Sequence, residues 1–107
     1  MPPLTLNFAD GSLSLPAATE FATALQQSLQ TLQQQITAAQ GGDRQSDFEF
    51  FDRQGDRSLE VFCNPNLWAS PHAAKVLLTV KQAPGLRLRV EVALTQLQED
   101  IQLYLGL

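Results

Sequence analysis

The stretch AATEFATALQQSLQTLQQQITAAQ, residues 17–40, decides the fold of this chain, and it contains a single charged side chain, Glu20. Its apolar residues recur every three or four positions, which is the spacing of one stripe along an α-helix. They are Ala18, Phe21, Leu25, Leu29, Leu32, Ile36 and Ala39. At ~1.5 Å per residue, the segment predicts a helix about 36 Å long, which reaches across a domain of ordinary size.

The opposite side of this predicted helix is polar but uncharged. Its residues are Gln26, Gln27, Gln30, Thr31, Gln33, Gln34, Gln35 and Thr37. Helix faces that contact only solvent usually carry charged side chains. The composition therefore leaves room for contact with another molecule along this side.

Short alternating patterns predict a hairpin before the helix. Apolar residues alternate with polar ones over residues 4–8 and 13–15, on either side of an Asp10-Gly11 turn signal. We expect Pro16 in the first turn of the helix, with Ser14 or Leu15 as the cap residue. Gly41-Gly42 then ends the helix, because glycine adopts the left-handed conformation at low cost.

Residues 43–60 form an acidic segment that contains a second predicted hairpin. Its strands, 47–53 and 58–64, join at Gly55-Asp56; a turn placed one residue earlier would set Glu49 opposite Glu60, a like-charge pair that costs free energy. The favoured register pairs Phe48 with Cys63, Phe50 with Val61 and Asp52 with Leu59 on one side of the sheet. Phe51 and Phe62 then lie on the other side.

The last third of the chain predicts a loop, two strands and a helix. Residues 64–74 contain two prolines and two asparagines and read as a loop, followed by strands at 75–82 and 86–93 around Ala83-Pro84-Gly85. The outward set of these strands is the only net-basic surface in the chain: Lys75, Leu77, Thr79, Lys81, Arg87, Arg89 and Glu91. Helical spacing from Leu94 to Leu105 predicts a C-terminal helix that Gly106 ends.

The order of elements is therefore strand-strand-helix-strand-strand-strand-strand-helix within one domain, residues 1–107. Consecutive strands joined by short turns form antiparallel sheets. We expect an α+β two-layer sandwich in which one long helix covers an antiparallel sheet of about six strands.

Composition excludes several classes of function. The net charge of −4 argues against nucleic-acid binding and against an anionic membrane surface as partner. No apolar run approaches the ~18 residues of a membrane span, and the first residues lack the pattern of a secretory signal. A single cysteine cannot form an internal disulfide, which fits a reducing compartment. We therefore expect a soluble cytoplasmic protein.

The chain shows no catalytic, metal or cofactor pattern. His72 is the only histidine and stands in a loop, away from any cluster of ligands. Cys63 falls on the face assigned to the core, which predicts a small buried hydrophobe rather than a nucleophile. The segment Asp52–Asp56 lacks the alternating ligands of a calcium loop. Glu99 and Asp100 are adjacent on a helix, so their side chains diverge, and we expect them on a solvated face. We expect neither an enzyme nor a bound cofactor.

Two hypotheses remain. The first is a non-enzymatic interaction or adaptor domain that binds another protein, including itself as a homodimer. Aromatics occur on both faces of the acidic hairpin, residues 43–60, and the outer face of residues 75–91 carries the opposite, basic charge, which favours specific docking. Its candidate contact residues are Phe51, Phe62, Trp68, Lys75, Lys81, Arg87 and Arg89. The second is a small-ligand domain with a pocket between helix and sheet, lined by Trp68 and phenylalanines. Trp68 fits a contact residue and an anchor of its own loop equally well.

No family motif occurs in the chain. The glutamine-rich helix and the overall texture are similar to those of small cyanobacterial proteins, several of which serve as accessory factors for photosynthetic assemblies. The resemblance implies an accessory role of the same kind.

Overall fold

The computed structural model describes residues 3–106 and contains the strands and helices in the predicted order. A hairpin of β1 (Pro3–Phe8) and β2 (Gly11–Pro16) precedes α1 (Thr19–Gln40). The four strands that follow are β3 (Phe48–Gln54), β4 (Arg57–Cys63), β5 (Lys75–Gln82) and β6 (Leu86–Ala93). The 3-10 helix η1 (Pro65–Leu67) lies between β4 and β5, and α2 (Leu94–Leu105) follows β6. The fold class is α+β with antiparallel sheets.

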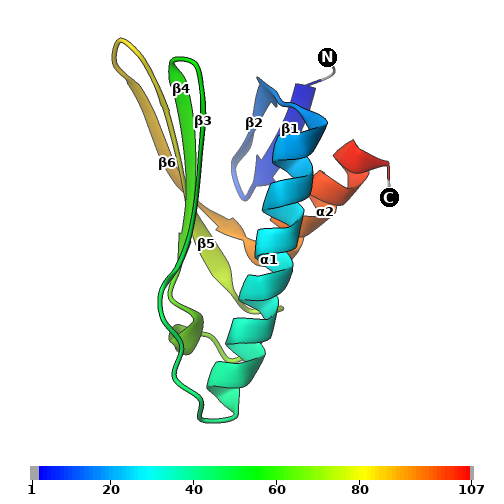
Figure 1. The fold of residues 1–107 in the computed structure, drawn as a ribbon, viewed down its shortest axis with the longest axis vertical. Helices are drawn as coiled ribbons and strands as arrows, with labels where there is room; N and C mark the ends of the chain where they lie inside the picture. The colour runs from blue at the N-terminus through cyan, green and yellow to red at the C-terminus, as the bar shows by residue number, and fades with distance from the viewer. Residues whose placement is uncertain (1–2, 107) are drawn as a thin grey trace.

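The strands form two sheets, which corrects the prediction of one sheet of about six strands. β3, β4, β5 and β6 make a four-stranded sheet in chain order, whereas β1 and β2 pair only with each other. The hairpin lies on one side of the larger sheet, against α2 and beside β6 (Figure 1). In that position Leu4, Leu6 and Leu15 are buried in the common core.

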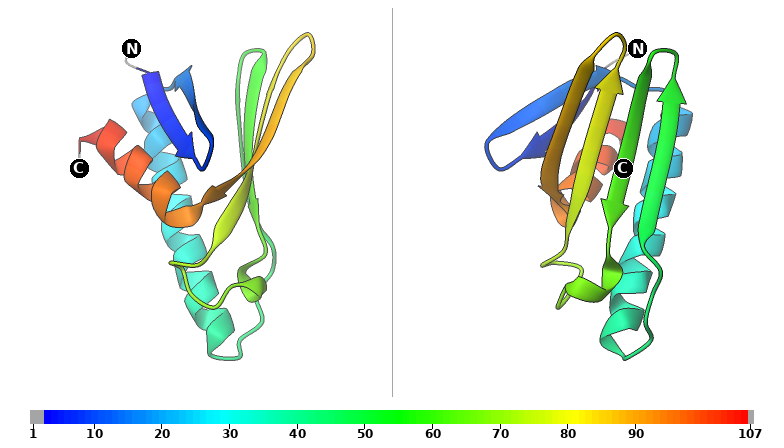
Figure 2. Two further views of the ribbon diagram at one scale, coloured as in Figure 1. Left: turned by 180° about the vertical axis from the view of Figure 1, so that it is seen from behind. Right: turned by 90° about the vertical axis from the view of Figure 1, so that its left-hand side faces the viewer.

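The cover over the sheet also differs from the prediction of one long helix. α1, α2 and the β1–β2 hairpin together lie on a single side of the four-stranded sheet (Figures 1 and 2). α1 contacts β3 and η1, while α2 contacts β1, β6 and α1. One apolar helix stripe is narrower than a four-stranded sheet, so Leu94, Leu97 and Ile101 of α2 complete the core.

α1 begins at Thr19, later than the prediction placed it. Pro16 ends β2 opposite Pro3 instead of opening the helix, and Ala18 is the N-cap without a side-chain hydrogen bond. Side chains of β4 and α2 donate hydrogen bonds to backbone carbonyls at the connection between β2 and α1. Arg57 of β4 donates from Nη2 to the Pro16 carbonyl at 2.6 Å, and the Tyr104 hydroxyl of α2 donates to the carbonyl of Ala17.

The hairpin of β3 and β4 has the predicted register. Phe48 lies opposite Cys63, Phe50 opposite Val61 and Asp52 opposite Leu59. The turn residue Gly55 has φ +57°, and no residue other than glycine has positive φ within residues 3–106. Glycine at the first central position is the requirement of a type II′ turn, whose twist suits paired strands.

Candidate interaction surface

One side of the four-stranded sheet is uncovered. Successive side chains of a strand point to opposite faces, and within residues 3–106 no helix or further strand lies over the face turned away from α1 and α2 (Figure 2, right). We call this the open face. Its side chains are Glu49, Phe51, Arg53, Ser58, Glu60, Phe62, Lys75, Leu77, Thr79, Lys81, Arg87, Arg89 and Glu91.

Strand register arranges most of the open face in three rows that cross all four strands. The first row is Glu49, Phe62, Leu77 and Glu91; the second is Phe51, Glu60, Thr79 and Arg89; the third is Arg53, Ser58, Lys81 and Arg87. Carboxylates therefore end the first row with two apolar side chains between them, and the third row contains three cations and no carboxylate. The open face is charge-polarised along the strand direction.

The apolar part of the open face centres on β3 and β4. Phe51 is 60% exposed, while Phe62 and Leu77 are half-buried. Thr79 is only 5% exposed, and its hydroxyl accepts a hydrogen bond from Arg89 Nε at 3.4 Å. An aromatic ring exposed to this extent at the middle of a strand is a typical feature of contact surfaces.

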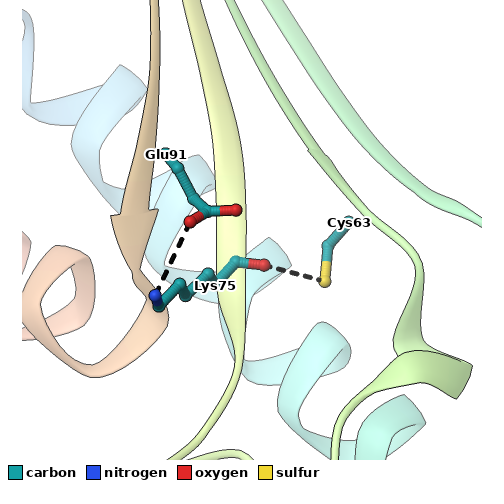
Figure 3. A network of polar contacts seen from close by, with 3 residues as sticks. All are labelled: Cys63, Lys75 and Glu91. Carbon is teal, nitrogen blue, oxygen red and sulfur yellow. Dashed lines mark hydrogen bonds and ion pairs between the residues drawn. The ribbon is translucent and has the colours of Figure 1, made fainter.

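The predicted basic residues all lie on the open face, and their side chains are exposed. Lys75 pairs with Glu91 at 3.6 Å between Nζ and Oε1, an exposed ion pair that contributes little to stability (Figure 3). Lys81 and Arg87 lie opposite each other on β5 and β6. Arg53, which the sequence did not single out, completes the basic row from β3.

Cys63 lies on the inner side of β4 and is buried, as predicted. Its thiol donates to the backbone carbonyl of Lys75 at 3.5 Å (Figure 3). Burial raises the pKa of the Cys63 thiol above its ordinary value of 9.0, and a hydrogen bond with the Trp68 side chain only partly opposes this. A protonated, buried thiol is a poor nucleophile at neutral pH.

Trp68 is the one predicted contact residue that lies away from the open face. It is half-buried and packs against the hydrophobic core at the end of η1. The neighbouring Asn66 ties this segment to the loop after α1, since its Oδ1 accepts from Gln45 N at 2.8 Å and its Nδ2 donates to the Gln45 carbonyl at 2.7 Å. These contacts favour the role of a loop anchor.

The remaining candidates for chemistry do not converge. His72 is exposed in the loop before β5. Across residues 3–106, no group of three or more His, Cys, Asp or Glu side chains is placed to hold a metal ion. In the same part of the chain, no helix is both long and apolar enough to cross a membrane.

A small cavity lies where the start of α1 meets the β3–β4 hairpin, and Leu15, Phe21, Arg57 and Leu59 are among its lining residues. Its volume is about 10 Å³, which accommodates one water molecule. A site for a small organic ligand requires several hundred Å³. Neither Trp68 nor the open-face phenylalanines line this cavity.

Sequence reasoning missed two features of this surface. It grouped the cations by strand but did not see that register places Arg53 in the same row, although the correct hairpin register contained that information. It also did not identify β3 as an edge strand, because no local pattern states which strand neighbours which.

Comparisons of the chain with protein-family models, with curated proteins and with solved structures found no match.

Proposed function

We propose that this protein is a non-enzymatic interaction domain that binds another protein on the open face of its four-stranded sheet. The observation that carries the proposal is the uncovered sheet face itself, with Phe51 exposed on β3. A sheet needs apolar cover on only one side, and that cover is complete on the side of α1 and α2. Aromatic side chains on the other side therefore add nothing to the core and are available for contact.

The charges on the open face indicate the chemistry of the partner. Cations outnumber carboxylates on this face, in a chain whose net charge is −4. Charge complementarity across an interface sets orientation and association rate more than affinity. A partner surface that meets Lys81, Arg87 and Arg89 with carboxylates, and Phe51 and Phe62 with apolar side chains, fits this arrangement.

Affinity capture from the native cell lysate tests the proposal when it compares surface variants of matched chemistry. Phe62→Asp introduces a carboxylate on the open face, whereas Leu103→Asp introduces one on α2, where Leu103 is 81% exposed. We expect Phe62→Asp to reduce recovery of a partner by about tenfold or more, and Leu103→Asp to leave recovery unchanged. Thermal unfolding shows that each variant remains folded. Equal recovery by the native chain and folded Phe62→Asp would contradict the proposal.

A further inference from the structure

We propose that a second copy of this chain pairs with the free edge of β3, so that two four-stranded sheets join into one sheet of eight strands. The inference goes beyond the proposed function, because the edge of β3 is distinct from the open face. β3 is an outermost strand of the sheet, with β4 on one side and no strand on the other within residues 3–106. In the right-hand view of Figure 2 this edge runs along the side of the molecule.

The unpaired backbone groups of β3 belong to three residues. Ala83 donates its N–H to the Asp56 carbonyl at 3.0 Å, which identifies a hydrogen-bonded pair between the strands β4 and β5. Bonded pairs alternate along antiparallel strands. Even-numbered residues of β3 therefore bond to β4, and the backbone groups of Glu49, Phe51 and Arg53 point to the free edge.

β3 lacks most of the features that usually prevent edge pairing. Its sequence, FEFFDRQ, contains no proline, glycine or lysine. All seven residues pair with β4 without a bulge. Natural edge strands are normally protected by such residues, by bulges or by inward-pointing charges. Of these devices β3 has the inward-pointing Asp52, which lies opposite Phe50 in the self-pair described below.

Self-pairing of β3 has one register that overlaps its full length, and the side chains favour that register. An antiparallel pair centred on Phe51 sets Phe51 opposite its own copy and Glu49 opposite Arg53 of the other chain, twice by symmetry. Opposite charges and aromatic pairs directly across antiparallel strands are stabilising. On the inner side, Phe50 meets Asp52 and Phe48 meets Gln54, which are pairs without like charges.

The opposite edge of the sheet, β6, is less suited to the same pairing. By the same alternation, the backbone groups of Arg87, Arg89 and Glu91 point outward. Outward-pointing residues lie opposite each other in an antiparallel self-pair, so no register overlaps all eight residues of β6. The register centred on Arg89 also sets two arginines directly opposite each other, which is destabilising. β6 also lies beside β1 for part of its length. The structure therefore favours β3.

The helix layer fits the same twofold arrangement. α1 lies behind β3 (Figure 2, right), and Phe21 of α1 packs edge-to-face on Phe50 of β3 with ring centres 6.1 Å apart. A twofold axis through the β3 edge places the two α1 helices next to each other. Gln33 marks the side of α1 that faces α2, because it accepts a hydrogen bond from Gln98 at 3.3 Å.

At ~100° per residue, the side of α1 opposite Gln33 contains Ala24, Ser28, Thr31 and Gln35, with Glu20 near it in the first turn. Antiparallel pairing keeps the two copies of Glu20 at opposite ends. Two antiparallel copies of this side meet without charge repulsion. Of the uncharged polar side that the sequence shows, this contact side includes Thr31 and Gln35.

Charge reversal across the proposed pair tests the inference with purified protein, by sedimentation equilibrium over a range of concentrations. Glu49→Arg alone sets two arginines opposite each other at both positions, and Arg53→Glu alone sets two glutamates there. We expect each single change to weaken the dimer by about tenfold or more. The double variant, Glu49→Arg with Arg53→Glu, restores opposite charges and is expected to dimerise like the native chain.

Arg87→Glu on β6 is the matched control, since it reverses an exposed open-face cation at the other edge and is expected to leave the dimer intact. Far-ultraviolet circular dichroism and thermal unfolding establish that every variant is folded. A native chain that stays monomeric, single variants without effect, or a double variant that is not rescued would each overturn the inference. A monomer that still captures a partner through Phe62 would leave the proposed function standing, whereas a dimer that captures nothing would contradict only the proposed function.

Discussion

At the scale of single residues, the carboxylate of Asp100 joins the two ends of the chain. It is 7% exposed and accepts hydrogen bonds from Asn7 N at 2.8 Å, Asn7 Nδ2 at 3.0 Å and Gln96 Nε2 at 2.9 Å. The first two bonds connect α2 to β1, which belongs to the separate hairpin. Sequence reasoning placed Asp100 on a solvated helix face, because only the tertiary contact reveals its partners.

Replacing Asp100 by alanine is expected to lower the free energy of unfolding by about 2 kcal/mol, since hydrogen bonds to a charged acceptor are among the stronger ones and their donors lose a buried partner. Chemical denaturation measures the change. Glu99→Ala alters the exposed neighbour in the same helix and is expected to shift the free energy by less than about 0.5 kcal/mol. A similar cost for both variants would contradict the link to β1 as the source of the effect.

At the scale of elements, the two hairpins of the four-stranded sheet provide a comparison of turns. Gly55, between β3 and β4, has φ +57°, whereas Gly85, between β5 and β6, does not have positive φ. No atom lies within 4 Å of a Cβ added at either position. The two glycines therefore differ in backbone conformation and not in available space.

Gly55→Ala is expected to destabilise the protein by about 1 kcal/mol, because an L-residue is strained at positive φ. Gly85→Ala is expected to be neutral or slightly stabilising, since alanine reduces the freedom of the unfolded chain. Denaturant titration of both variants checks the difference. The turn assignment would be wrong if Gly85→Ala proved the more damaging change.

Local patterns predicted correctly those features of each element that depend only on residues close together in the sequence. The bounds of β5 and β6, the register around Gly55-Asp56 and the end of α2 at Gly106 are as expected, because alternation, turn residues and caps act within a few residues. The predicted position of the β1–β2 hairpin, as part of one larger sheet, was wrong. An amphipathic hairpin has one apolar side whether it extends a sheet or packs on it, so the pattern does not distinguish the two. The predicted start of α1 was wrong because Pro16 is equally compatible with the end of a strand and with a first helical turn.

At the scale of the whole molecule, all the cover of the four-stranded sheet lies on one side, which leaves an open face and the edge of β3. The sequence placed Phe51 and Phe62 on one side of the sheet, and the structure leaves that side uncovered, since α2 packs on the other side with α1. That outcome depends on which face α2 selects after β6, and its apolar stripe alone does not decide it. Contact surfaces of this kind are consequently visible only once the layers are known.

Amide hydrogen exchange, followed by NMR as a function of protein concentration, tests the central claim most directly. The N–H groups of Glu49, Phe51 and Arg53 point to the free edge, whereas those of Phe50 and Asp52 bond to β4. If a second copy pairs at this edge, exchange at Glu49, Phe51 and Arg53 slows as the concentration rises, while exchange at Phe50 and Asp52 is slow throughout. Fast exchange at those three amides at every concentration, or concentration-dependent protection at β6 instead, would contradict the account.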